Sequence, residues 1–454
     1  MSASESSKFE ELYIESNDQE RTADLKSGIV SIDYYEDILS PTVTAKIRVI
    51  NTGDSISPKD PNNSKKVDGP KQSIYNGLPL RGGERVVMKI LDRGKTFEGK
   101  DKTGLDFSSD PSKYLFVSSI TQVLQETQRE SFLLNLVSRE AITNETTRVF
   151  KRYTGIISET VKKILKDVLV VDDSRVKVEP TEHGYDFVGN LRKPFATLVN
   201  LASKSVPDKS GDATAGFVFF QTQDGFQFSS IDTLINKKSK ATYIYTEINK
   251  SSTTRNNDFN ILQYSIDKNQ NLIENLRMGT YSFSRLSFNP LSFAFSQETY
   301  SYGQKNSDEK SNRMSNLGTN KLELPKISDD ASLTLDQLPT RVVSQIVDVG
   351  ATVGISTDDN YSPDKYQGQN IVRYNLLMTQ SVSMTVPCNT DLRAGDVITC
   401  EFPKISREDS SEIDSETSGK YMIKELCHHF EAKRSFTSLR LVRDTYGLYG
   451  GESW

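Results

Sequence analysis

Residues 216–235 read GFVFFQTQDGFQFSSIDTLI, and this stretch predicts a short aromatic β-hairpin. Asp224-Gly225 separates two strand-like runs, which is a strong signal for a two-residue hairpin turn with positive φ at the glycine. Because side chains alternate along a strand, Phe217 and Phe219 share one face of the first run, and Phe226 and Phe228 share one face of the second. We expect these rings to pack across the hairpin. A ligand-stacking role for the rings is the less common alternative. The structural residues expected here are Phe217, Phe219, Asp224, Gly225, Phe226, Phe228 and Asp232.

Both ends of the chain are also rich in β-branched and aromatic residues. IVSIDYY from Ile29 and TVTAKIRVI from Thr42 predict strands near the N-terminus. SVSMTVP, DVITCEF, YMIKELCHHF and SFTSLRLV predict strands in the last 115 residues. A turn matching the one in the hairpin is expected between the first two of these C-terminal strands. Its residues are Leu392, Gly395, Asp396 and Val397.

The segment between these β-rich ends has a helical period. In SETVKKILKDVL the apolar residues recur at i, i+3, i+4, i+7 and i+8 from Val161, which predicts an amphipathic helix. A second helix is expected to begin at Pro194, since proline suits the first helical turn. The lysines on the first helix are more typical of a solvated face than of a phosphate-binding track.

Composition excludes several function classes. The 454 residues predict roughly three domains, and hydrophobic residues at 35% leave the chain poorer in apolar side chains than an average domain. A net charge of −5 gives no general nucleic-acid footprint. No apolar run is long enough to span a membrane and no export signal precedes the chain, so we expect a soluble protein. The common hydrolase, metalloprotease and nucleotide-binding motifs are absent, so no catalytic residue and no cofactor is expected.

Two clusters raise the question of a metal. Cys427-His428-His429 resembles a ligand set, but Cys388 and Cys400 are too far away in sequence for the short pairs of a zinc site. Small buried thiols and two histidines on opposite faces of one strand are the favoured interpretation. The acidic loop near residue 410 lacks the spacing of a calcium loop, and an exposed hairpin loop is favoured. We therefore expect no metal site. The acidic residues are Glu408, Asp409, Glu412, Asp414 and Glu416.

The order of these segments resembles a known family, the central baseplate hub subunits of contractile-tailed bacteriophages and related tail hub proteins. The resemblance rests on LQETQRESFLLNLVSREAITNE, then the amphipathic helix, then the aromatic hairpin. It continues with VPCNTDLRAGDVITCEFP and SGKYMIKELCHHFEAKRSFTSLRLVRDTYG. It covers most of residues 114–235 and 370–447, and none of the matching segments is a catalytic motif.

The resemblance implies an α+β fold, mostly β, with two tube-type β-barrel domains and smaller α/β domains inserted between them. The expected domains are a first barrel over 1–125 with a long loop at 51–75, and a small α/β domain over 126–212. A second, discontinuous barrel is expected over 213–245 and 340–447. An inserted β-rich domain with a polar linker is expected over 246–339.

The resemblance further implies a structural virion protein in the tail baseplate, made in the host cytoplasm. Three copies would form a ring that joins the hexameric tail tube, or tube-initiator proteins, to a separate threefold spike. The expected neighbours also include the tape-measure protein and the surrounding wedge proteins, with no sequence-specific nucleic-acid binding and no membrane insertion. DNA would pass through the ring. The alternative from the enzyme class is a tail-associated cell-wall hydrolase, which the absence of a catalytic constellation disfavours.

Overall fold

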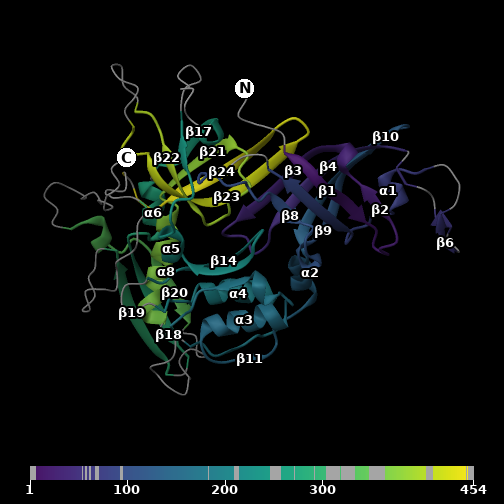
Figure 1. Ribbon diagram of the computed structural model, residues 1–454. Helices are drawn as coiled ribbons and strands as arrows, with labels where there is room; N and C mark the ends of the chain where they lie inside the picture. The colour runs from purple at the N-terminus through teal and green to yellow at the C-terminus, as the bar shows by residue number, and fades with distance from the viewer. Residues whose placement is uncertain are drawn as a thin grey trace.

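A computed structural model gives the fold and shows a mostly β protein with a helical side (Figure 1). It describes residues 7–53, 55–56, 59–60, 63–66, 71–92, 96–182, 184–208, 214–245, 257–269, 271–290, 292–302, 317, 333–346, 363–404, 413–445 and 447. Within these residues, no helix has the length and apolar character needed to cross a membrane.

The described part of the chain forms short strands and helices. The strands are β1 Lys8–Glu15, β2 Thr22–Asp24, β3 Ile29–Asp37, β4 Thr44–Thr52, β5 Lys59–Asp60, β6 Asn63–Lys66, β7 Arg85–Leu91, β8 Leu105–Phe107, β9 Leu115–Gln125, β10 Arg129–Ser138, β11 Arg152–Tyr153, β12 Val176–Val178, β13 Phe187–Val188, β14 Phe217–Thr222, β15 Gly225–Ser230, β16 Thr242–Ile244, β17 Gln263–Asn269, β18 Ser282–Asn289, β19 Ala294–Ser301, β20 Val342–Ile346, β21 Gln380–Pro387, β22 Val397–Glu401, β23 Gly419–Glu431 and β24 Ser435–Arg443. The helices are α1 Ile74–Gly77, α2 Arg139–Thr146, α3 Ile157–Asp167, α4 Pro194–Ala202, α5 Ile231–Ile235, α6 Leu272–Met278 and α8 Pro363–Leu377.

One antiparallel run of eight strands dominates the molecule, in the order β17-β21-β24-β23-β3-β4-β10-β9. Its middle pair, β23 and β3, joins the C-terminal strands to the N-terminal strands over seven residue pairs from Glu425–Asp37 to Glu431–Ser31. The two β-rich ends of the sequence therefore form one continuous sheet.

Each half of this run has the same topology. In the N-terminal half the strands occur along the chain as β3, β4, β9, β10 and lie in the order β3-β4-β10-β9. In the C-terminal half they occur as β17, β21, β23, β24 and lie in the order β17-β21-β24-β23. Both halves thus place their first, second, fourth and third strands side by side, and each ends in a β-hairpin formed by its last two strands.

The same sheet continues beyond the run to cover one face of each half, since β9 also pairs with β7 and β23 also pairs with β22. In the N-terminal half, Ile32, Ile47 and Leu134 are fully buried and belong to one core with residues of β1, β7 and β8. In the C-terminal half, Val382 and Leu441 are fully buried and share a core with residues of β16 and β22. Two hydrophobic cores under one sheet support the expected mostly β, α+β fold.

The aromatic hairpin forms, with β14 and β15 paired from Phe217–Ser230 to Thr222–Gly225. Its two turn residues are Gln223 and Asp224, because Gly225 pairs with Thr222, so the turn lies one residue earlier than the predicted Asp224-Gly225. Its sheet is β12-β15-β14, which packs with α3 and α4 in a small α/β module. Every residue of β14 is buried because one face packs into this module and the other onto the C-terminal half. The helix predicted to begin at Pro194 begins there.

Several domain boundaries expected from the sequence are wrong. β10 lies beyond the expected boundary at 125, yet it pairs with β4 and β9 and so belongs to the N-terminal half. The hairpin expected in the second barrel over 213–245 lies in the sheet of the α/β module. The region expected to be a long loop over 51–75 also contains the short β5–β6 ribbon.

The expected insert over 246–339 is divided between two sheets. β17, within that range, is the outermost strand of the C-terminal half. β18 and β19 instead form a separate sheet with β20, which lies in the range assigned to the second barrel. Residues of α8 pack on this sheet through Val372 and Leu376. Strand pairing between distant segments, which leaves no local sequence signal, decides all of these boundaries.

Candidate functional site: a polar sheet face and the junction beneath it

One face of the eight-strand run is buried and the other carries polar side chains. On β21, Val382, Met384 and Val386 point into the core while Ser381, Ser383 and Thr385 are part-exposed. The same alternation occurs on the neighbouring strands. We call the part-exposed side the polar face; its residues include Ser31, Asp33, Tyr35, Thr44, Lys46, Arg48, Ser131, Asn135, Ser383, Thr385, Glu425, Cys427, His429, Ser438 and Arg440.

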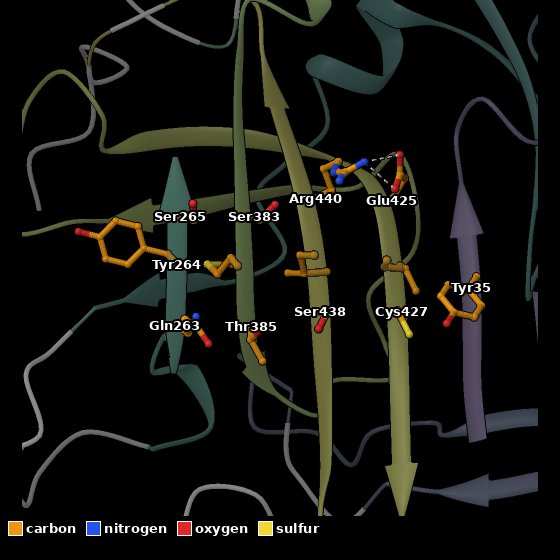
Figure 2. Close-up of a pocket in the computed structure, with 13 residues that line it drawn as sticks. Tyr35, Gln263, Tyr264, Ser265, Ser383, Thr385, Glu425, Cys427, Ser438 and Arg440 are labelled. Carbon is orange, nitrogen blue, oxygen red and sulfur yellow. Dashed lines mark hydrogen bonds and ion pairs between the residues drawn. The ribbon is translucent and has the colours of Figure 1, made fainter. Parts of the chain in front are cut away.

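The polar face is hollowed across the middle of the run. A groove of about 340 Å³ is lined by residues of β17, β21, β24, β23 and β3. Figure 2 shows the side chains of Tyr264, Ser383, Ser438, Cys427 and Tyr35 on these five neighbouring strands. A second hollow of about 290 Å³ continues along β3 and shares Tyr35 and Glu425 with the first. The concave surface therefore runs across the seam between the two halves.

Some charges on the polar face are paired with each other, whereas Lys46 lies over the Tyr35 ring and Arg48 donates to Gln122. Arg440 lies 3.4 Å from the Glu425 carboxylate, the pair drawn with dashed lines in Figure 2. His429 contacts Asp33 through Nδ1 and lies 3.0 Å from Glu431 through Nε2. Burial lowers the His429 pKa, but its hydrogen bonds with Glu431 and Asp33 outweigh burial, so its pKa is raised overall.

The adjacent histidine has the opposite environment. His428 is fully buried on the core side of β23, and burial lowers its pKa to about 3. Its Nδ1 lies 2.9 Å from Thr437 Oγ1. The expectation that the two histidines lie on opposite faces of one strand is confirmed.

A buried carboxylate organises the junction beneath the polar face. Glu36 of β3 is 2% exposed and accepts hydrogen bonds from the backbone nitrogens of Gln223, at 2.7 Å, and Ala394, at 2.9 Å. The Tyr34 hydroxyl donates a third bond at 2.8 Å. Burial raises the Glu36 pKa, while Arg393 and these hydrogen bonds lower it. One side chain thus holds the N-terminal half, the hairpin turn and the C-terminal turn.

The two turns predicted from the sequence meet at this junction. Arg393 Nε lies 3.4 Å from the Asp224 carboxylate, which links the C-terminal turn to the tip of the hairpin. Asp396 accepts from the Arg393 backbone nitrogen at 3.0 Å and pairs with Lys240 at 2.7 Å. Gly395 has a φ of +79°, and a Cβ there would lie 3.0 Å from the Phe220 ring. Residues predicted separately therefore form one cluster.

The apolar members of both predicted sets are buried in adjoining cores. Phe217 and Phe228 lie 5.0 Å apart between ring centroids, and Phe219 and Phe226 stack at 5.7 Å. Phe195 of α4 packs against the second pair, so the aromatic faces are occupied by the protein's own side chains. Leu392 and Val397 are buried under the C-terminal turn. The expected packing role of the hairpin rings is therefore the one they have here.

Sequence reasoning missed the cation that holds Asp232 in place. Arg373 of α8 is 1% exposed and places Nη2 2.5 Å from Asp232 and Nη1 3.1 Å from Asp444. Burial raises the Asp444 pKa, and Arg373 acts against that effect. No motif surrounds Arg373. The apolar residues of α8 do not form a clear stripe, so the sequence gives no sign that the Arg373 side chain is buried.

The part of the chain with described positions contains no group of three or more potential metal ligands. Cys388 and Cys400 are buried free thiols, and burial raises the pKa values of both. Four of the residues considered as ligands lie outside the described residues, namely His183, Glu408, Asp409 and Glu412. Of the acidic loop, Asp414 and Glu416 are described.

Comparison with known proteins agrees with the resemblance in the sequence. No protein-family model matches the chain. A protein of Vibrio phage KVP40 described as "Probable baseplate hub protein gp334" is 23% identical over 313 residues, which cover 65% of this chain and 67% of that protein. The crystal structure of the tail protein from Neisseria meningitidis MC58 superposes with a TM-score of 0.52 at 11% identity, covering 96% of both chains. The chain is thus similar in sequence to a phage baseplate hub protein and has the fold of a tail protein.

Proposed function

We propose that this chain is a structural subunit of a tail baseplate, and that three copies form the hub ring between tail tube and spike. The observation that supports this proposal is the repeated topology of the two sheet halves. Inside one chain, the third strand of the C-terminal half, β23, pairs antiparallel with the first strand of the N-terminal half, β3. The corresponding strands at the two ends of the run are β9 and β17.

These two end strands have the open edges that a ring needs. Among the described residues, β17 pairs on one side only, with β21. The outer part of β9, from Ser118 to Gln125, pairs only with β10 on its inner side. If β9 of one copy pairs with β17 of the next as β23 pairs with β3, the edges are covered and the ring closes.

The ring would have the symmetry of both of its neighbours. Three copies of an eight-strand run make three times eight, or 24, strands. Because each run consists of two similar halves, the ring has six similar units and can continue a hexameric tube. The exact symmetry of the ring is threefold, because the six units are similar and not identical, and this symmetry suits a separate trimeric spike. The tape-measure protein above and the wedge proteins around it are the other proposed neighbours.

The polar face would line the channel of this ring. Hydroxyl-bearing side chains are the commonest kind among the named residues of this face, and two contacts on it pair groups of opposite charge. A protein that grips DNA neutralises phosphates with several lysines or arginines, whereas a neutral hydroxyl-rich wall lets the duplex slide. We infer that DNA passes along this face during ejection.

Mass photometry of the full chain tests the ring. A trimer has a mass of three times 51.0 kDa, or 153 kDa. Leu262 donates its N–H to the Thr385 carbonyl, so the backbone groups of Thr385 face β17 and those of its register partner Gln263 face β21. Alternation along β17 directs the Ser265 N–H to β21 as well, and the Ile266 N–H to the open edge. Ile266→Pro removes this edge donor and should raise the trimer dissociation constant at least tenfold, by about 1.4 kcal/mol or more. Ile266→Ala is the matched control and should still form trimers.

Two outcomes count against the ring. One is a wild-type chain that stays at 51.0 kDa at micromolar concentration. The other is an Ile266→Pro trimer as stable as the control. Circular dichroism melting of each variant separates loss of assembly from loss of folding, because β17 is an edge strand and proline is tolerated at edges.

A further inference from the structure

The α/β module contains a cavity that the ring does not use. It measures about 480 Å³, within the range of small-ligand and peptide side-chain pockets, and lies between β13 and α4. None of the residues that line it belongs to the polar face, so an occupant could bind without entering the proposed channel.

The base of the cavity is aromatic and ordered. Tyr185 and Phe187 line it and stack with centroids 5.5 Å apart, and Tyr153 stacks on Phe187 at 5.4 Å. Tyr185 is 7% exposed, so the protein's own packing holds these stacked rings in place. Such a base suits an aliphatic or aromatic group of the occupant.

Two cations belong to the cavity wall. The Lys204 ammonium donates to the Tyr185 hydroxyl at 2.6 Å and lies 4.1 Å from the centre of the same ring, which fixes its position. Arg192 lines the cavity, and none of the described carboxylates pairs with it. Asp186 also lines the cavity, but its carboxylate accepts from the Gly155 nitrogen at 3.1 Å and faces Arg152 at 3.9 Å. The wall is thus suited to an anionic group.

The lining also includes an exposed apolar side chain and strained backbone. Val188 lines the cavity and exposes 54% of its surface. Asn190 and Leu191 have φ values of +49° and +58°, a conformation that is costly for leucine. Consecutive strained residues of this kind cluster at ligand-binding sites. Val188 would cover an apolar residue next to the anionic group.

We propose that this cavity binds an acidic peptide segment of a partner protein, with a Glu or Asp carboxylate between Arg192 and Lys204 and an apolar neighbour on Val188. Charge complementarity with the two cations and the aromatic base beside Val188 carry this choice. A nucleic acid presents a series of phosphates and would call for a longer row of cations than two. This proposal is independent of the ring.

Panning of a random heptapeptide display library on the full-length chain tests the proposal. We expect enrichment of sequences with Glu or Asp beside Leu, Ile, Val or Phe, and loss of that enrichment on the Arg192→Gln/Lys204→Met variant. The best peptide is then measured by fluorescence anisotropy. Either single substitution should weaken it about tenfold or more, since each removes a charge-assisted contact. Lys163→Gln, an exposed lysine of α3 with the same charge change, should leave the affinity within about twofold of wild type.

Three results would overturn the proposal. Enriched peptides without an acidic residue would contradict the anionic site. Peptides that bind the double variant as well as wild type would place binding elsewhere. Displacement of the peptide by a dT oligonucleotide or by inorganic phosphate at equal concentration would assign the cavity to phosphate. Mass photometry of the double variant should match wild type, so a failure here leaves the ring proposal intact.

Discussion

The carboxylate of Glu36 lies 2.7 Å from the backbone nitrogen of Gln223, a residue 187 positions later in the chain. Its other oxygen accepts a hydrogen bond from the backbone nitrogen of Ala394, which lies a further 171 positions after Gln223 in the chain. Two separate turns are therefore held by one side chain of β3. Because β3 is also the strand that forms the seam with β23, this junction connects the seam to both turns.

Glu36→Gln should destabilise the protein although it keeps the shape of the side chain. The amide NH2 must face either the Gln223 or the Ala394 nitrogen, and two donors then oppose each other in a buried site. We expect a loss of about 2–3 kcal/mol in the free energy of unfolding, measured by urea denaturation. Tyr34→Phe removes one hydrogen bond to the same carboxylate and should cost about 1 kcal/mol. Equal stability of Glu36→Gln and wild type would refute this role.

Gly225→Ala tests the hairpin turn. Gly225 has a φ of +127°, and a Cβ there would lie 2.1 Å from the Arg175 carbonyl oxygen. Both the backbone strain and the clash with β12 oppose any side chain, so we expect a loss of at least about 3 kcal/mol. Gly53→Ala is the control, since a Cβ at Gly53 meets nothing within 4 Å. Thermal unfolding that shifts equally in the two variants would show that the turn tolerates a side chain.

The local parts of this fold follow from sequence, as the hairpin and α4 illustrate. Asp224-Gly225 between two aromatic runs predicts the hairpin, although the turn itself occupies Gln223 and Asp224, and Pro194 marks a helix start through its own fixed φ. Alternation along β23 likewise predicts the opposite environments of His428 and His429. In each case neighbouring residues carry the whole signal.

The pairing of strands that are far apart in the chain could not be predicted from the sequence. Pairing of β10 with β4 and of β17 with β21 depends on segments about 80 and 120 residues apart, and no local pattern distinguishes these partners from others. The sequence also gives no sign that the two turns meet at Glu36, because a glutamate in a strand is more often exposed than buried. The resemblance to hub proteins supplied the architecture but not the boundaries.

Arg373→Met should be more damaging than any surface change of the same charge. It leaves the carboxylates of Asp232 and Asp444 buried without their shared cation. Loss of one partner from such a buried cluster costs about 3–5 kcal/mol, whereas replacing the whole cluster by neutral groups costs less. The triple variant Arg373→Met/Asp232→Asn/Asp444→Asn should therefore recover part of the stability seen in chemical denaturation. A single variant no less stable than the triple one would contradict the ion cluster.

His429 should make the seam between the halves sensitive to pH. Its pKa is raised in the folded protein, because Glu431 and Asp33 outweigh the effect of burial. A raised histidine pKa stabilises the fold fully below the unfolded value of about 6.5, and this stabilisation is lost as pH rises through the folded pKa. Buried His428 acts in the opposite direction, since its lowered pKa costs stability on acidification below about pH 6.5. The wild-type profile therefore contains both effects.

The difference between wild type and His429→Gln isolates the seam. Melting temperatures of both proteins are measured from pH 5.5 to 8.5, within roughly one to two units of the unfolded pKa. We expect wild type to exceed the variant most at the acidic end, with the gap closing as pH rises. Glu431→Gln should reduce the gap because it removes one of the two partners, whose Oε1 lies 3.0 Å from Nε2. A gap that is constant with pH, or that widens toward alkaline pH, would mean that His429 contributes to the seam only through packing on Phe436, 4.5 Å away between ring centroids.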